Sequence, residues 1–271
     1  MGWLLVVVPG VIWGASFLFI AEGLQAVAPM GVTFVRIAVG FVTLSLVPSA
    51  RRPIVRGDRL KTALLGILWL AFPLSMFPLA EQHVSSALAG MLNGATPLFA
   101  ALVASVLARR APSRRVAAGL AIGFAGAALI ALPSLSSANA ATDRVTGQTP
   151  GILMILMALV SYAFAYSLAR PLQQRNGALP VIWRALAVAL ALTAPLGAPA
   201  LANARWTGRS VASLLALGAL GTGVAYASSL AIVGAGICLT GAWVIKPATT
   251  ETAQSRNGNV KHRERLDSRV V

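Results

Sequence analysis

The sequence predicts an all-α fold, a polytopic bundle of membrane helices in which two inverted five-helix repeats follow one another and the second repeat is incomplete. We expect about eight membrane spans, with nine as the alternative. Three observations support this prediction: an apolar composition, clusters of basic residues that recur between apolar stretches, and an internal repeat whose spacing shortens toward the C-terminus.

The composition argues against a soluble globular protein. Of the 271 residues, 57% are hydrophobic and 11% are charged, and the mean hydropathy is +0.78. Soluble domains have about 45–50% apolar and about 25% charged residues, and a disordered chain needs low hydrophobicity. The net charge of +15 does not predict a nucleic-acid partner, because the basic residues form short clusters between apolar stretches instead of one continuous basic face.

Apolar stretches long enough to cross a bilayer recur along the chain. A hydrocarbon core of about 30 Å needs about 20 helical residues. No cleaved signal peptide is expected, since the first stretch is too long for its apolar region and no Lys or Arg precedes it. The expected spans are residues 3–24, 30–47, 62–80, 84–108, 116–135, 151–169, 178–202 and 210–246.

The basic residues predict the direction of the spans. If the first helix runs outward, the cytoplasmic loops hold eleven Lys and Arg residues through the seventh span and the outer loops hold three. Positive residues concentrate in cytoplasmic loops. We therefore expect a multi-pass protein of the plasma or inner membrane with a cytoplasmic N-terminus.

Segments of the first half recur in the second half. Trp13 in VIWGASF corresponds to Tyr162 in LVSYAFAY, 149 positions later, and Arg36 corresponds to Arg184, 148 positions later. Five helices are an odd number, so the second copy is inverted in the membrane. Inverted repeats are typical of secondary transporters, whose substrate site lies where the repeats meet.

The spacing of the repeat shortens near the C-terminus. LGIL at 65–68 corresponds to LGAL at 217–220, 152 positions later, whereas LAIGFAGAAL at 120–129 corresponds to LAIVGAGICL at 230–239, only 110 positions later. The second half therefore lacks about 40 residues, which is enough for one membrane helix and its loop. The missing block is the counterpart of residues 75–118.

The chain resembles the EamA family of the drug/metabolite transporter superfamily. The segments that carry the resemblance are WGASF (13–17), FVRIAVG (34–40), ALAGMLNGATPLFAALVASVL (87–107), GLAIGFAGAALI (119–130) and GTGVAYA (221–227). The resemblance implies ten helices in two inverted repeats, cytoplasmic termini, and transport of small metabolites, amino acids or drugs, often outward.

Two departures from the family pattern stand out. The family usually has Gly-Glu after its fourth helix, where this chain has Ala108 and Arg109. GTGVAYA of the eighth helix is followed directly by a segment similar to the tenth, so the ninth helix is absent. The resemblance and the repeat spacing therefore locate the same gap.

These observations divide the chain into three parts. Residues 3–135 form the first EamA-like repeat, residues 150–246 the second, shortened repeat, and residues 247–271 a polar tail that we expect to be disordered. The last apolar stretch is 37 residues long, too long for one straight span, and we expect a kink near Ser228 and Ser229.

Two arginines within spans are candidate binding residues. Arg36 is about six residues into the second helix, and a charge inside a membrane is costly unless it meets water or a partner. It is interpreted either as an anchor for an anionic group of the substrate or as a side chain that reaches the outer interface. Arg184 has the same two interpretations.

Asn93 and Pro97 predict a broken helix. Pro97 has no N–H for the carbonyl of residue 93, so that carbonyl is free and the helix can kink. Free backbone at membrane depth is tolerated where it is satisfied again or lines a cavity. The pair is interpreted either as part of a binding site or as a kink closed by a hydrogen bond.

The remaining candidates are aromatic and acidic. Trp13, Tyr162 and Tyr166 are interpreted as lining a substrate pathway or as ordinary packing residues. Glu81, in the turn after the third span, is expected to be an outer gate, a partner of Arg36, or a solvated turn residue. No acid or histidine is expected deep in a span, so proton coupling is not predicted.

We predict an integral membrane transporter, an exporter of small metabolites, amino acids or drugs that works by alternating access. Alternatives are a degenerate relative that inserts without transporting and, less well supported, an intramembrane enzyme; no enzymatic motif supports the last. No cofactor and no metal are expected, and Cys238 is the single cysteine. The expected partners are the small-molecule substrate and the bilayer, without nucleic acid, and a homodimer is an alternative assembly.

Overall fold

The computed structural model describes residues 2–109, 111–112, 114–136 and 145–224, which contain helices and turns and no strand. The predicted all-α membrane bundle is confirmed. The helices of the first half are α1 (Gly2–Leu24), α2 (Pro29–Ser45), η1 (Pro48–Arg51), η2 (Arg56–Asp58), α3 (Arg59–Leu65), η3 (Gly66–Ala71), α4 (Phe72–Ala80), α5 (Ser86–Asn93), α6 (Thr96–Leu107) and α7 (Arg114–Ser136). Those of the second half are α8 (Val145–Asn176), α9 (Ala178–Ala200), η5 (Leu201–Asn203), α10 (Gly208–Gly218) and η6 (Ala219–Val224).

These helices agree with the predicted spans as far as the described residues reach. Four helical stretches are long and apolar enough to cross a membrane: Arg56–Ala80, Ser86–Leu107, Gln148–Asn176 and Ala178–Asn203. Shorter apolar helices cover Trp13–Leu24, Pro29–Ser45 and Val116–Gly126. The predicted kink near Ser228, the end of the last span and the polar tail lie outside the described residues.

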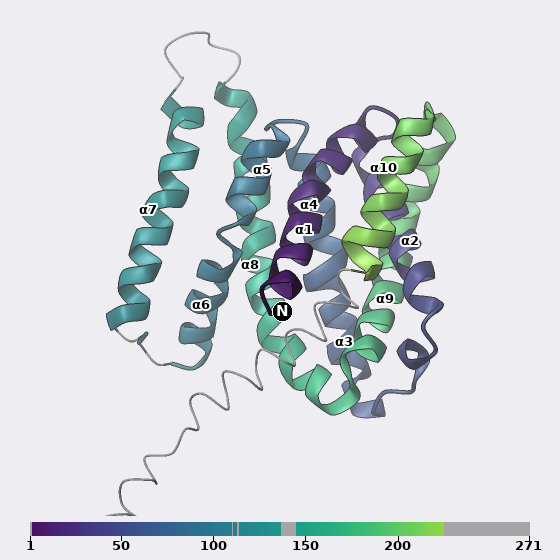
Figure 1. The fold of residues 1–271 in the computed structure, drawn as a ribbon, viewed down its shortest axis with the longest axis horizontal. Coiled ribbons are helices and arrows are strands. Elements are labelled where there is room, and N and C mark those ends of the chain that lie inside the picture. Colours follow the sequence, from purple (N-terminus) through teal and green to yellow (C-terminus); the bar gives the residue numbers. More distant parts are fainter. Residues whose placement is uncertain (1, 110, 113, 137–144, 225–271) are drawn as a thin grey trace, which may run out of the picture. The chain divides into compact units, whose positions relative to one another are not determined.

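Tight contacts join the two halves where α2 crosses α9. A Cβ on Gly31 of α2 would lie 3.2 Å from the Cβ of Ala200, and a Cβ on Gly197 of α9 would lie 2.8 Å from the carbonyl oxygen of Met30. Small residues allow helices in membranes to approach this closely. The pair α2 and α9 therefore forms a seam between the first and second halves (Figure 1).

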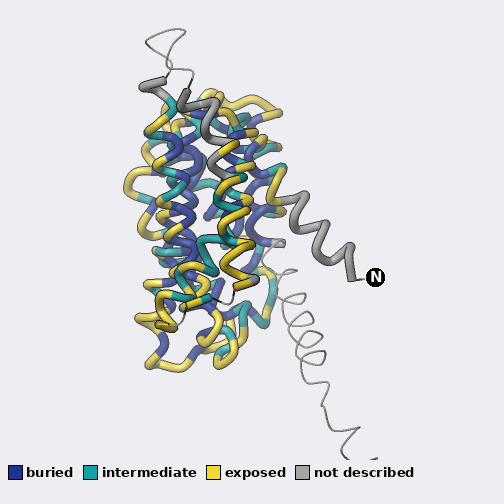
Figure 2. The backbone as a smooth tube through the Cα atoms, turned by 90° about the vertical axis from the view of Figure 1, so that its left-hand side faces the viewer, coloured by how far each residue is buried: buried dark blue, intermediate teal, exposed yellow. Residues whose placement is uncertain are grey.

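Two further helix pairs extend the core on either side of this seam. α1 packs along α10, and α4 packs along α8. Figure 2 shows buried positions in the interior of the bundle and exposed positions on its outside and at its ends. The side chains of Ile20, Ile37, Leu74, Leu159 and Leu186 are each at most 1% exposed, and they form part of one continuous apolar core.

The chain groups by its contacts into residues 1–230 and residues 231–271. The second group falls wholly outside the described residues.

Candidate functional site

Arg36 is the most deeply buried charged side chain among the described parts of the predicted spans. The residue is 6% exposed, and its Nε donates a hydrogen bond to the hydroxyl of Thr222 at 3.1 Å. A Cβ on Gly221 would lie 2.9 Å from the hydroxyl of Ser16 and 3.9 Å from the Arg36 guanidinium. Three helices, α1, α2 and η6, therefore meet at this guanidinium, and its position is inside the bundle instead of at an interface.

We call Ser16, Arg36, Gly221 and Thr222 the Arg36 cluster. Two of its residues belong to a π-helical turn, and a second such turn lies in the other half of the chain. η6 is a π-helix, and so is η3. The wider winding frees carbonyl oxygens for other donors, and such turns are frequent at functional sites. Trp13 Nε1 donates to the carbonyl of Gly221 in η6 at 3.3 Å, and Ser161 Oγ donates to the carbonyl of Leu68 in η3 at 2.7 Å. Each turn is thus held by the first helix of the opposite half.

The paired turns fix the alignment of the two halves. A Cβ on Gly66 would lie 2.7 Å from the carbonyl oxygen of Ala185, and a Cβ on Gly218 would lie 2.9 Å from the carbonyl oxygen of Arg36. Ala185 therefore takes the place that Arg36 has in the first half. The predicted correspondence of Arg36 with Arg184 is off by one residue, because two arginines one step out of register align well in sequence but face different ways on a helix.

Arg184 accordingly lies elsewhere. Its Nη1 donates to the carbonyl of Pro180 at 3.2 Å, and its guanidinium lies 5.4 Å from the ring centre of Trp183. The Trp183 indole donates to Ser45, the last residue of α2, at 2.7 Å. Arg184 is therefore close to the C-terminal end of α2, away from Arg36. The first repeat has a buried arginine inside the bundle, and Arg184 of the second repeat is not its equivalent.

A row of aromatic rings crosses from one half to the other. Phe17 and Phe77 have ring centres 5.4 Å apart, Phe77 and Tyr162 6.1 Å, Tyr162 and Tyr166 6.1 Å, and Tyr166 and Trp69 5.8 Å. Tyr162 and Tyr166 are the counterparts of Trp13 and Phe17 at the spacing of 149. The structure thus brings the two predicted tyrosines into one row at the junction of the repeats, and it places Trp13 on the Arg36 cluster.

The predicted helix break at Asn93 and Pro97 is present. α5 ends at Asn93 and α6 begins at Thr96. The hydroxyl of Thr96 donates to the Asn93 carbonyl at 2.6 Å and also lies 3.2 Å from Asn93 Oδ1. The free carbonyl is therefore satisfied locally, which agrees with the interpretation as a closed kink. No hydrogen bond within the described residues connects Asn93 or Pro97 with Arg36.

Glu81 ends α4 and reaches the start of α5. Its Oε2 accepts a hydrogen bond from Ser86 Oγ at 2.8 Å, while its Oε1 is buried without a hydrogen-bond partner. Burial raises the pKa of Glu81 from 4.5 to about 7, although the Ser86 hydrogen bond and the charge of Arg36 act in the opposite direction. The electrostatic influence of Arg36 agrees with their predicted association, but no ion pair joins them among the described residues.

Hydroxyl groups that sequence reasoning passed over complete the site. Thr33, which is fully buried, donates to the carbonyl of Leu74 at 3.1 Å. That carbonyl is free because Pro78, four residues later, has no N–H. The signal was present in the sequence, since a proline within a helix always predicts a free carbonyl, but the partner on α2 could not be inferred from spacing.

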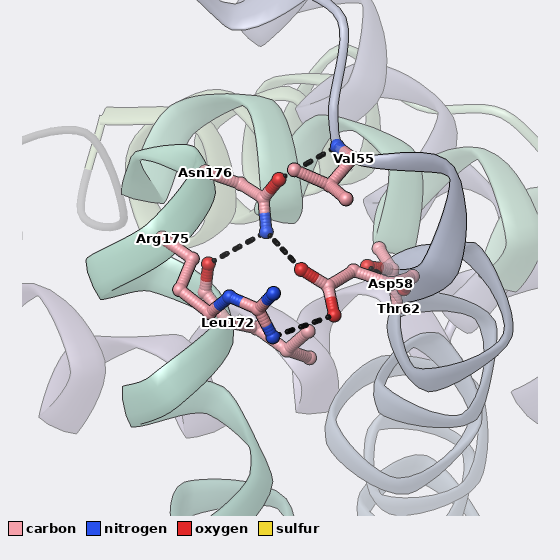
Figure 3. Close-up of polar contacts among 6 residues, drawn as sticks. All are labelled: Val55, Asp58, Thr62, Leu172, Arg175 and Asn176. Carbon is pink, nitrogen blue, oxygen red and sulfur yellow. Dashed lines mark hydrogen bonds and ion pairs between the residues drawn. The ribbon is translucent and has the colours of Figure 1, made fainter.

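A second polar group that the sequence did not reveal lies at the end of α8 (Figure 3). Asp58 is 2% exposed; its carboxylate accepts from Asn176 Nδ2 at 2.8 Å and lies 3.4 Å from Arg175 Nη1. The Asn176 Oδ1 accepts from the backbone N–H of Val55 at 2.8 Å. We call Val55, Asp58, Arg175 and Asn176 the Asp58 cluster. The one signal in the sequence is that Asp58 is a lone acid in a basic loop.

The described part of the chain offers no group of three His, Cys, Asp or Glu side chains arranged to hold a metal ion. What it offers is a buried guanidinium, hydroxyl groups and aromatic faces. This combination suits noncovalent binding of a small polar or aromatic molecule.

Comparison with known proteins places the first half in a family. Residues 1–132 match the model of the EamA-like transporter family. No curated protein and no solved structure matches the chain.

Proposed function

We propose a transport mechanism for this chain, which belongs to the EamA-like transporter family and is a multi-pass membrane protein. It carries small metabolites, amino acids or drugs out of the cell by alternating access, with the two repeats rocking about a site near the bilayer midplane. No enzymatic activity, cofactor or nucleic-acid partner is part of this proposal.

The pair of π-helical turns is the observation that supports this proposal most directly. η3 and η6 occupy corresponding places in the two halves, and each is bonded to the opposite half through Trp13 or Ser161. Secondary transporters place irregular helices at the repeat interface, where backbone groups meet the substrate. A movement of one half against the other would exchange these hydrogen bonds.

Arg36 is the residue that we assign to substrate binding. A guanidinium presents several donors in one plane and suits a carboxylate or phosphate group. Its burial beside Ser16 and Thr222 supports recognition of a substrate with an anionic group. The aromatic row would receive an apolar or aromatic body. Trp13, Tyr162 and Tyr166 would line the same path.

Flux through proteoliposomes tests this function. The full chain is reconstituted and screened with amino acids, other carboxylates and aromatic amines, and Arg36→Gln is compared with Arg36→Lys and with Arg114→Gln, an exposed control. A hydrogen bond to a charged group contributes about 1.5–3 kcal/mol, so Arg36→Gln should weaken binding of anionic substrates about 10- to 100-fold. Equal flux of wild type and Arg36→Gln would show that Arg36 does not bind the substrate.

A degenerate relative that inserts without transporting is the second candidate. The family model covers residues 1–132, and the second repeat is predicted to lack one helix. Normal insertion without flux for any compound in the panel would favour this candidate. If flux appears only in crosslinked dimers, a second copy supplies the missing helix.

The proposed orientation has a cytoplasmic N-terminus in the plasma or inner membrane. Single cysteines at Arg52 and at Gln82, in a background where Cys238 is replaced by serine, should react differently with an impermeant reagent in intact cells. Labelling at Gln82 alone is expected, because the basic loop that contains Arg52 belongs inside. Labelling at Arg52 alone would reverse the orientation.

A further inference from the structure

Glu81 is a half-buried acid in an unfavourable place for a negative charge. It is the residue that caps the C-terminus of α4, where the helix dipole presents its negative end and disfavours a carboxylate. One carboxyl oxygen is bonded by Ser86, while Oε1 is shielded from solvent and has no hydrogen-bond partner. A protonated carboxyl does not carry this electrostatic cost.

The surroundings of Glu81 supply one positive influence, which comes from Arg36 on α2. His83 lies in the same turn and packs against α8, since a Cβ on Gly151 would lie 2.9 Å from the His83 Cβ. Glu22, at the same end of α1, is engaged by Arg209 at 2.9 Å. The other titratable or charged groups on helices that pack against α4 and α5 are Tyr162 and Tyr166 on α8, Arg170 and Arg175 at the far end of α8, and Arg114 and Arg115 at the far end of α7.

From this geometry we propose that Glu81 is a proton-binding site coupled to the opening of its end of the protein. The carboxyl holds a proton on the shielded Oε1 while the turn between α4 and α5 is closed. When α5 moves away from α4 and water enters, the O–H bond breaks and the proton passes to water, leaving the carboxylate hydrated and attracted by Arg36. This inference rests on the proposed alternating access.

The direction of the pH effect follows from the two states. The buried carboxyl has a pKa of about 7, against 4.5 as its ordinary value. Between these values the closed state binds a proton that the open state releases, so lower pH in this range stabilises the closed state. Above pH 7 the closed state also carries the charge, and opening becomes easier.

An infrared titration of the intact protein in lipid nanodiscs tests proton binding without any substrate. The chain has only seven acidic residues, so the carbonyl band of one protonated carboxyl can be followed as the pH is raised. Wild type should lose a band with a midpoint near pH 7, Glu81→Gln should lack that change, and Glu22→Gln should retain it. A wild-type band that disappears only near pH 4.5, or one that survives Glu81→Gln unaltered, would overturn the proposal.

Two further variants test whether the titration midpoint belongs to Glu81 in a protein that is correctly folded. Ser86→Ala and Arg36→Gln each remove an influence that lowers the pKa of Glu81, so each should move the midpoint to higher pH. If neither moves it in a folded protein, the titrating group is not Glu81 in this environment. A midpoint near pH 7 combined with no flux of any compound would retain the proton site and contradict the transport function instead.

Coupling to opening needs a second measurement. A cysteine in place of Ala80, which is fully buried, reports water access below the turn in a background without Cys238. Its modification rate by an impermeant reagent, corrected for the reactivity of a free thiol at each pH, should rise about tenfold from pH 6 to pH 8 in wild type and stay constant in Glu81→Gln. A corrected rate that is independent of pH in wild type would contradict the coupling.

Discussion

The two ends of the described bundle are closed by corresponding elements that use different chemistry. At one end the loop between α2 and α3 is held against the end of α8 through the Asp58 cluster (Figure 3). At the other end the loop between α9 and α10 and the start of α10 are held against the end of α1, through the backbone of Arg205 and through Arg209, which pairs with Glu22. Because α8 and α1 are counterparts, each end joins a loop of one repeat to the first helix of the other.

The end with the Asp58 cluster is closed around one buried carboxylate, whose partners are the half-buried Asn176 and the exposed Arg175. The Asp58 side chain is 3% exposed, and Asn176 bonds both to its carboxylate and, through Oδ1, to the backbone of Val55. α8 and α9 are then joined by a single residue, Gly177, whose φ of 79° is in the region that favours glycine. Little of this end can move without exposing unpaired polar groups.

The other end is closed by a solvated ion pair and one backbone hydrogen bond. The Arg209 side chain is 81% exposed and that of Glu22 is 14% exposed, and the backbone N–H of Arg205 donates to the carbonyl of Ala26 at 2.8 Å. Exposed ion pairs contribute about 0–1 kcal/mol. The comparison therefore indicates that the Glu22 end, which also carries Glu81, is held less firmly than the Asp58 end.

Removing Asp58 should produce the largest effect. Asp58→Ala removes the buried carboxylate that accepts from Asn176 and pairs with Arg175, and leaves the Asn176 amide with the carbonyl of Leu172 alone. The free energy of unfolding should therefore fall by about 2–3 kcal/mol. The free energy of unfolding should fall by less in Asp58→Asn, because asparagine keeps an oxygen for the Asn176 amide. Denaturant unfolding in mixed micelles measures both. An Asp58→Ala variant as stable as wild type would show that the two ends do not differ in this way.

Gly66, the first residue of η3, and Gly218, the residue before η6, test whether the repeats are equivalent. A Cβ on Gly66 would lie 2.7 Å from a carbonyl oxygen of α9, and one on Gly218 would lie 2.5 Å from the Val39 Cβ. Both alanine variants should lose about 1–3 kcal/mol of stability because the helices must separate.

The control for these variants is Gly14→Ala. A Cβ at Gly14 meets no atom within 4 Å, so alanine there should be neutral or more stable by about 0.5–1 kcal/mol, the usual advantage over glycine in a helix. Thermal unfolding of the three variants gives the ranking. If only one of Gly66→Ala and Gly218→Ala is destabilised, the two π-helical turns are not equivalent in their packing.

Much of the fold could be predicted because membrane helices are encoded locally. Length and hydropathy placed the helices from α1 to α9, and Pro97 located the break between α5 and α6, since both follow from the chemistry of a few adjacent residues. The π-helical turns could not be predicted in this way, because their carbonyls are satisfied by Trp13 and Ser161 from the opposite half.

The site was predictable in its residue types more than in its pairings. Arg36 was identified because a charge in a span is costly, but its bond to Thr222 spans 186 residues of sequence and no spacing rule predicts it. Glu81 was expected in a turn, where it lies, yet the shielding of its carboxyl depends on tertiary packing. The alignment of Arg36 with Arg184 was wrong because sequence identity outweighed helix register.

The smallest expected effect comes from the exposed ion pair. Arg209→Ala should change the free energy of unfolding by less than about 1 kcal/mol, and by nothing measurable in high salt, because water and ions already screen both charges. Arg205→Ala is the matched control, since its structural contribution is a backbone hydrogen bond that alanine retains. Parallel denaturant curves at low and high ionic strength measure these differences. A loss in Arg209→Ala as large as that in Asp58→Ala would mean that both ends are held equally, and the Glu22 end would then have no advantage in opening.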